Sequence, residues 1–195
     1  MQALGQQVLN LEALAAHKGS VLGDLPGQVQ PSQKMFETQI LHTLSAFDPA
    51  RPVYVEAESK RIGLLRLPDA VYQGIQQGQW LGLHVPVAAR VRFLLQDYAY
   101  FLHSPVLIAQ LDRLAATCGK AQVDVWKTAV ANGQYEVLVE DLLVKHYDRY
   151  YDRSMQQLQS ADAQGRVLGT ADVSDAGFME LAQRIVQRTE ITRAS

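Results

Sequence analysis

Val53-Tyr54-Val55-Glu56-Ala57-Glu58-Ser59-Lys60-Arg61-Ile62-Gly63 follows a chain breaker, Arg51-Pro52, and places charged residues directly after a β-branched and aromatic run. The run from 53 to 55 predicts a short buried strand. Ligands of open α/β sheets bind outside the carboxyl ends of the strands, so the charges that follow this strand are candidates for a site. A solvated exit from the strand, whose charges pair with one another, remains an open alternative.

The composition of the 195 residues is that of a globular protein, since 48% are apolar and the chain is long enough for one sizeable core. The net charge of -2 excludes a surface that is basic throughout, so a nucleic-acid site must be a local basic patch. Cys118 is the single cysteine, and with no second cysteine and no nearby histidine it predicts a small buried hydrophobe in a reducing compartment. We expect a cytoplasmic protein without a membrane partner, because no apolar run reaches the length of a membrane helix and no signal-peptide pattern precedes the first strand.

Hydrophobic periodicity predicts alternating strands and helices as far as residue 104. Strands are expected at 7–11, 53–55 and 80–85, with a brief extended piece at 64–67. Helices are expected at 12–17, at 33–47, from Pro68 to near Gly74 or Gly78, and at 86–103. Ser32 is a candidate N-cap for the second of these helices, whose apolar face is expected to lie in the core. This face contains Met35, Phe36, Ile40, Leu41 and Leu44.

Beyond Pro105 the pattern becomes helical, with helices expected at 105–117, 122–132 and 135–150, and a last amphipathic helix from Asp175. Residues 166–168 are compatible with one short strand. The sequence therefore predicts an α/β domain followed by a helical lobe.

The doublet Glu56 and Glu58 has the form of the acid that holds the Mg²⁺ shell in nucleotide-binding sheets. Its usual companion, the phosphate cradle G-x-x-x-x-G-K-[ST], does not occur in the 195 residues. His17, beside Lys18-Gly19-Ser20, is a candidate for contact with an anion, although a lone loop histidine is more often structural. No metal site is predicted, because the five histidines fall in separate elements.

Two further groups of cations are candidates for anion contacts. Arg90 and Arg92 lie on opposite sides of one expected helix, so that one faces an anion or both are solvated. The segment 145–153 interleaves cations with tyrosines, which favours phosphate contacts and base stacking. The alternative is an amphipathic helix end whose tyrosines pack inward.

Five blocks of residues, taken in order, resemble the carboxyl-terminal P-loop domain of the tRNA 2-selenouridine synthase family. The blocks are Leu11–Ser20, Gln30-Pro31-Ser32-Gln33 with Phe36-Glu37, Val55–Gly63, Arg90 with Asp97-Tyr98, and His146-Tyr147-Asp148. In this family of transferases a rhodanese-like domain with a catalytic cysteine precedes the P-loop domain. The resemblance implies conversion of wobble 2-thiouridine in tRNA to 2-selenouridine, through an S-geranylated intermediate and with selenophosphate as selenium donor.

The sequence also departs from the family pattern. The rhodanese-like domain, the first strand and the P-loop have no counterpart here, and Cys118 does not match the catalytic cysteine. Ala57 stands where the family usually has an acid, and the pair Lys60-Arg61 replaces a single residue. The resemblance therefore implies an α/β fold in which a partial P-loop-type parallel sheet, at residues 1–104, precedes a helical carboxyl-terminal lobe, at residues 105–195.

The matched positions carry the roles that the resemblance implies. Catalytic roles are implied for Glu56, Glu58 and Arg61. Contacts to selenophosphate, geranyl diphosphate or another substrate anion are implied for His17, Gly19, Ser20, Ser32, Gln33, Ser59 and Arg90. We assign contacts with tRNA, the expected partner, to Lys60, Lys145, Arg149 and Arg153, and expect this chain alone to bind no cofactor or metal.

Two interpretations of function stay open at this point. The first is a truncated tRNA 2-selenouridine synthase that is inactive on its own, and the second is a non-catalytic tRNA-binding or scaffold module with the same fold. An ordinary P-loop kinase relative is disfavoured, because the blocks outside the strand end have no reason to recur in such a protein.

Overall fold

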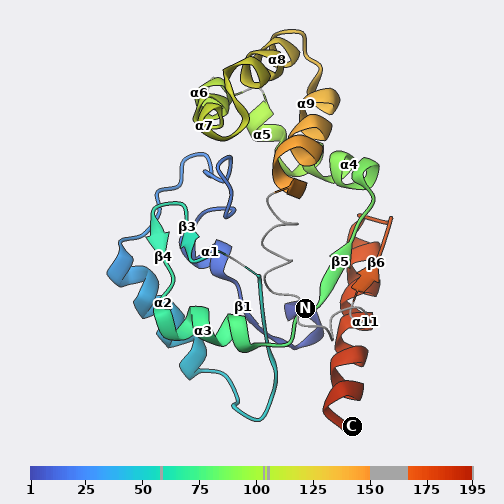
Figure 1. Cartoon of the computed structure of the whole chain (residues 1–195). Helices are drawn as coiled ribbons and strands as arrows, with labels where there is room; N and C mark the ends of the chain where they lie inside the picture. Colours follow the sequence, from blue (N-terminus) through green and yellow to red (C-terminus); the bar gives the residue numbers. More distant parts are fainter. Residues whose placement is uncertain (58, 103, 105, 150–166, 195) are drawn as a thin grey trace. The chain divides into compact units, whose positions relative to one another are not determined.

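The computed structural model describes residues 1–57, 59–102, 104, 106–149 and 167–194 (Figure 1). These residues combine short strand pairs with many helices, which confirms the expected α/β class. The chain divides into two compact units, unit 1 with residues 1–79 and 179–195 and unit 2 with residues 80–178. The P-loop type of the sheet and a domain boundary near residue 104 stay predictions.

Unit 1 is built on a parallel pair of strands, β1 (Gln7–Leu9) and β2 (Val53–Val55), in which Gln7 lies opposite Val53 and Leu9 opposite Val55. Leu9 is buried at 3% exposure, as expected of a central strand. Val53 is 40% exposed, and Tyr54 and Val55 are only half-buried, so the expectation of a buried second strand is wrong. The physical reason is that this sheet has two strands among the described residues, which leaves part of β2 without a cover.

Three helices of unit 1 begin within one residue of their expected starts, and they are α1 (Leu11–Ala15), α2 (Gln33–Ser45) and α3 (Asp69–Gln77). A short 3₁₀ helix, η1 (Gln2–Leu4), precedes β1. The hydroxyl of Ser32 accepts a hydrogen bond from the N–H of Met35 at 3.3 Å, which confirms the predicted N-cap of α2. Phe36 and Ile40 on α2 are buried, but Met35 and Leu41 are 52% and 69% exposed. Only part of the predicted apolar face of α2 is therefore buried in the core.

A hairpin of β3 (Arg61–Ile62) and β4 (Leu65–Arg66) completes the strands of unit 1. Gly63, with φ of 60°, and Leu64 form its turn. Ile62 and Leu65 are buried at 0% and 4%, so the hairpin packs one face on the core and exposes the other. Sequence reasoning missed β3 because a strand of two residues has no measurable periodicity.

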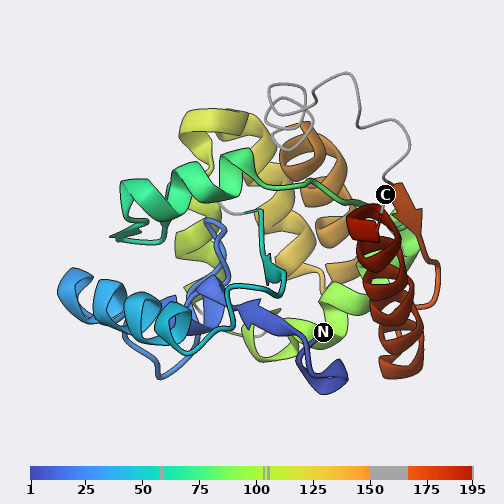
Figure 2. The same ribbon diagram turned by 90° about the horizontal axis from the view of Figure 1, so that it is seen from below.

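Unit 2 is mostly helical. Its helices are α4 (Val87–Asp97), α5 (Ala99–Leu102), α6 (Val106–Arg113), α7 (Ala115–Cys118), α8 (Lys120–Ala131), α9 (Tyr135–Leu142) and the π-helix η2 (Leu143–Tyr147). Figures 1 and 2 show α6 to α9 gathered in one bundle, drawn in yellow-green to orange. Trp126 of α8 and Leu111 of α6 lie at its centre, exposed by 1% and 0%. The single helix expected at 86–103 is interrupted at Tyr98, where α4 ends and α5 begins.

A second parallel pair lies in unit 2, where β5 (Gly82–His84) pairs with β6 (Val167–Gly169) (Figure 1). The brief strand that the sequence allowed near 166–168 is therefore present. The last helix, α11 (Asp175–Ala194), follows it, and the ring of Phe178 meets Phe93 of α4 edge to face at 5.3 Å. None of the described helices is long and apolar enough to span a membrane.

Replacing Gly63 by alanine should destabilise unit 1 strongly. Its positive φ strains an L-residue, and an added Cβ would overlap the Gln30 amide oxygen and come within 2.9 Å of the His17 ring. We expect a loss of about 3 kcal/mol in the free energy of unfolding, from the backbone strain and displaced hydrogen bonds together. The measurement is chemical denaturation.

The matched control is Gly27→Ala, at a glycine with φ of 69° and open space around the added Cβ. This variant should lose only about 1 kcal/mol, the cost of the left-handed conformation itself. Equal losses in the two variants would show that the close packing around Gly63 contributes nothing.

Candidate anion-binding site

Glu56 lies at the carboxyl end of β2, as the sequence predicts, and its position there has a structural cause. Its Oε2 accepts a hydrogen bond from the N–H of Leu11, the first residue of α1, at 3.1 Å. Because β1 and β2 are parallel, the end of β2 lies beside the start of the helix that follows β1. A carboxylate is favourable at this position, where backbone N–H groups lack partners within the helix. Its catalytic role stays a prediction, and Glu58 lies outside the described residues.

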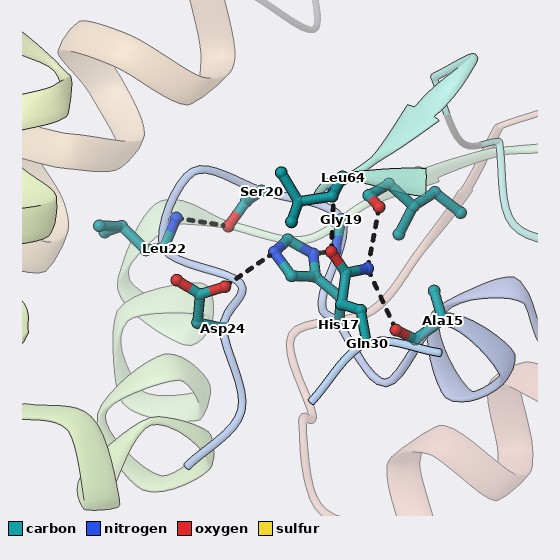
Figure 3. Close-up of polar contacts among 9 residues, drawn as sticks. Ala15, His17, Gly19, Ser20, Leu22, Asp24, Gln30 and Leu64 are labelled. Atoms are coloured by element: carbon teal, nitrogen blue, oxygen red, sulfur yellow. Dashed lines mark hydrogen bonds and ion pairs between the residues drawn. The ribbon is translucent and has the colours of Figure 1, made fainter. Parts of the chain in front are cut away.

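The loop that follows α1 closes on His17 (Figure 3). His17 is 4% exposed, its Nδ1 accepts from the N–H of Gly19 at 3.1 Å, and its Nε2 lies 3.4 Å from Asp24 Oδ1. Since Nδ1 is an acceptor, the proton of the neutral ring is on Nε2 and is donated to Asp24. The Ser20 hydroxyl accepts from the N–H of Leu22 at 3.2 Å. The three predicted anion contacts at 17, 19 and 20 thus lie together, but these polar groups bond within the loop.

Two electrostatic effects act on His17 in opposite directions. Burial lowers the pKa of the His17 imidazole, and the charge of Asp24 and its hydrogen bond raise it, with burial the larger effect. The pKa is therefore below its usual value, and the ring is neutral at pH 7. A neutral ring with these two contacts holds Gly19 and Asp24 of the loop in place. It does not supply positive charge to an anion.

Two glutamine side chains fix the β3–β4 hairpin. The Gln30 amide donates to the carbonyls of Ala15 and Ile62 at 3.1 and 3.0 Å, and its oxygen accepts from the N–H of Leu64 at 2.7 Å (Figure 3). The Gln33 amide bonds the backbone of Arg66 on both sides, donating to its carbonyl at 2.7 Å and accepting from its N–H at 2.9 Å. The Gln33 side chain thus makes the two hydrogen bonds to Arg66 that a neighbouring strand would otherwise make. Sequence reasoning named Gln33 but gave Gln30 no role, although both belong to one of the five blocks.

A pocket of about 440 Å³ opens beside this hairpin in unit 1. It is lined by Gln33, Glu37, Lys60, Arg66, Leu67, Pro68 and Asp69. Lys60 lies 2.7 Å from Asp69 Oδ1 and 5.8 Å from the centre of the Tyr72 ring. The hydrogen bond and charge of Lys60, with a smaller effect of Arg66, hold the pKa of Asp69 below its usual value. Two predicted residues, Gln33 and Lys60, therefore meet at one pocket, together with Arg66, which sequence reasoning did not name.

Ser59 and Arg61 lie next to this pocket along the chain. The Ser59 hydroxyl donates to the carbonyl of Arg61 at 2.5 Å and accepts from its N–H at 3.2 Å. Ser59 therefore fixes the backbone from which the Arg61 side chain projects, and that side chain is exposed. The implied roles of both residues stay predictions.

The described cations of unit 2 that the sequence singled out have different partners. Arg90 of α4 makes a two-pronged ion pair with Asp148, with N–O distances of 2.6 and 2.9 Å, and this contact raises the pKa of Arg90. Lys145 pairs with Asp141 at 2.6 Å, and Arg149 is exposed. Arg153 lies outside the described residues. Of the described cations predicted to contact tRNA in this unit, Lys145 and Arg149 are both exposed.

Cys118 corrects one expectation from the sequence. Its Sγ lies 3.3 Å from Nδ1 of His146, so a histidine that is 28 positions away in sequence is its neighbour in space. Burial raises the pKa of the Cys118 thiol and lowers the pKa of His146. Both shifts favour a neutral pair, and because Cys118 is half-buried, the expectation of a buried cysteine is wrong.

The stability of the protein should fall when the pH is lowered from 7.5 to 5.5. A histidine whose pKa is lower in the folded state stabilises the fold fully above its unfolded pKa of 6.5, and this contribution is lost as the pH falls toward the folded pKa. His17→Gln, which cannot be protonated, should show a smaller loss over this range in urea denaturation. The same substitution of His42, which is exposed on α2, is the matched control.

His146 contributes a loss of the same sign, because burial lowers its pKa as well. Some pH dependence should therefore remain in His17→Gln. An identical fall in stability for the wild type and His17→Gln would contradict the burial of a neutral imidazole in this loop.

Comparison with known proteins shows which family this sequence matches. Residues 1–118 match the model of the tRNA 2-selenouridine synthase AAA domain. The tRNA 2-selenouridine synthase of Nitrosomonas europaea is 35% identical over 111 residues, which are 55% of this chain and 28% of that protein. The synthase of Alcanivorax borkumensis is 31% identical over 173 residues, which are 74% of this chain and 48% of that protein.

The chain thus spans between about a quarter and about a half of these relatives, and no solved structure matches it. The family match covers β1, α1, the loop around His17, the β3–β4 hairpin and Arg90. The resemblance seen in the five blocks is therefore confirmed: the chain belongs to the tRNA 2-selenouridine synthase family.

Proposed function

We propose that this chain supplies part of the machinery of a tRNA 2-selenouridine synthase. The reaction is the replacement of sulfur in wobble 2-thiouridine by selenium, through an S-geranylated intermediate and with selenophosphate as donor. The observation that carries the proposal is the match of residues 1–118 to the AAA domain of this enzyme. The partner is tRNA, and the small substrates, selenophosphate and geranyl diphosphate, are anions.

The charges that support this function are those around β2 and the β3–β4 hairpin. Glu56, with Glu58 two residues later, follows the strand end at which ligands of α/β sheets bind. Arg61 and Lys60 supply positive charge close to it in the chain. We propose that Glu56 and Arg61 act on the reacting groups and that Lys60 contacts an anionic substrate.

Other predicted contact residues are better explained as positioning residues. The polar groups of Ser20, Ser32 and Ser59 all bond backbone atoms close to them in the chain. Gln33 and the His17 ring are likewise committed to the hairpin and the loop. We propose that these residues hold the loops that carry the charged groups, and that Arg90 holds α4 to Asp148.

A hybrid enzyme tests the proposed function. The matching segment of the Nitrosomonas europaea synthase is replaced by the corresponding residues of this chain, and the hybrid is expressed in cells without an enzyme of this kind. We expect 2-selenouridine in the tRNA, measured by mass spectrometry of nucleosides. An inactive hybrid that is folded and still binds tRNA would favour the non-catalytic tRNA-binding module.

The substitution Glu56→Gln in this hybrid separates chemistry from structure. The glutamine oxygen still accepts from the N–H of Leu11, so stability should change by about 1 kcal/mol or less. Selenium transfer should fall on the order of a hundredfold, the effect of losing a charged catalytic contact. Glu12→Gln, which removes the same charge on neighbouring α1, is the control. Wild-type transfer in folded Glu56→Gln would leave Glu56 with the structural role alone.

A further inference from the structure

The register of the β3–β4 hairpin brings together two arginines that the sequence separates. Arg61 and Arg66 are directly opposite residues in the antiparallel pair. Their neighbours Ile62 and Leu65 are buried at 0% and 4%, so both arginines lie on the exposed face of the hairpin. Directly opposite residues have Cβ atoms about 5 Å apart, which allows two arginine side chains to reach one ligand.

Like charges directly opposite each other on a hairpin are unfavourable in the absence of a counter-charge. The two acids that line the adjacent pocket are engaged by other side chains, because Asp69 pairs with Lys60 at 2.7 Å and Glu37 accepts from Gln33 at 2.8 Å. Lys60 and Arg66 line the pocket together with these two acids, and Arg61 lies opposite Arg66 on the hairpin. These five side chains carry three positive and two negative charges, so Arg61 adds positive charge beside a pocket whose own charges balance.

The backbone under both arginines is held by side chains. Gln33 bonds the N–H and the carbonyl of Arg66, and Ser59 bonds the same two groups of Arg61. Gln30 fixes the turn between the strands through Ile62 and Leu64. A ligand that binds the guanidinium groups therefore does not have to order this backbone, which lowers the entropic cost of binding.

We propose that Arg61 and Arg66 bind one phosphate group between them, either from the RNA backbone or from a small diphosphate. This inference rests on the proposed function and deepens it, since it gives an anion site to residues that include the unassigned Arg66. A guanidinium group binds phosphate oxygens through two parallel N–H donors, and a phosphate has enough oxygens for two such groups. The bound phosphate also removes the repulsion between the two cations.

The test measures binding of the full 195-residue chain to fluorescently labelled tRNA over a range of salt concentrations. Arg61→Ala and Arg66→Ala should each weaken binding about fivefold to tenfold, and the double variant should be little weaker than either. The slope of log K against log salt should fall by about 0.7 to 0.9 in all three variants, because they lose the same phosphate contact. Lys34→Ala, at an exposed cation of α2 in the same unit, is the control.

A second arm uses inorganic diphosphate, titrated calorimetrically and as a competitor of tRNA. If tRNA binding depends on the arginine pair and diphosphate does not displace the tRNA, the bound phosphate belongs to RNA. Binding of diphosphate that is lost in the variants, with tRNA binding retained, assigns it to a small ligand. Thermal unfolding is the control for folding, and the midpoint should be unchanged or higher in the variants, because removing either arginine relieves repulsion.

Three results would overturn the inference. They are no binding of either probe by the wild type, unchanged binding of both in folded variants, and a salt slope that falls twice as far in the double variant as in the single ones. Binding of tRNA that depends on Arg149 and not on the pair would refute the inference and leave the proposed function intact. An inactive hybrid enzyme with binding that still depends on the pair would refute the proposed function and leave the inference intact.

Discussion

The carboxamide of Gln30 is the interaction on which the arrangement of the site in unit 1 depends. It bonds backbone groups of Ala15, Ile62 and Leu64, which come from the end of α1 and from the turn of the β3–β4 hairpin. These groups lie between 15 and 34 positions from Gln30 in sequence. The bonds to Ala15 and Ile62 are partly buried, where a backbone group without a partner is costly, so this one side chain fixes how α1 meets the hairpin.

The same contact explains why neighbouring positions are small or neutral. Gly63 has no room for a Cβ between Gln30 and the His17 ring, and Gly23 is equally close to that ring. His17 is buried and neutral beside Asp24, so it fills space and orders the loop without adding charge. Two arginines of the unit, Arg61 and Arg66, lie on the hairpin, and Arg66 lines the pocket beside it.

Unit 2 joins its elements by different means. The Arg90–Asp148 ion pair connects α4 with the residue that follows η2, and the Cys118–His146 contact connects α7 with η2 itself. Two blocks that carry the family resemblance, at Arg90 and at 146–148, therefore meet in this unit. The π-helical turn at 143–147 lies where both contacts reach the chain, and such turns are frequent at functional sites.

The sequence by itself determined the features that depend on neighbouring residues. The strand at 7–9, the Ser32 cap, the proline-led start of α3 and the charges after β2 all follow from local pattern, because caps, breakers and hydrophobic periodicity act within one or two turns of chain. Only the tertiary structure decided the rest. It placed Gln30 against the hairpin, Arg66 opposite Arg61 and His146 beside Cys118. These pairings depend on hydrogen bonds and packing between distant segments, and on strands of two residues, which leave no periodic signal in the sequence.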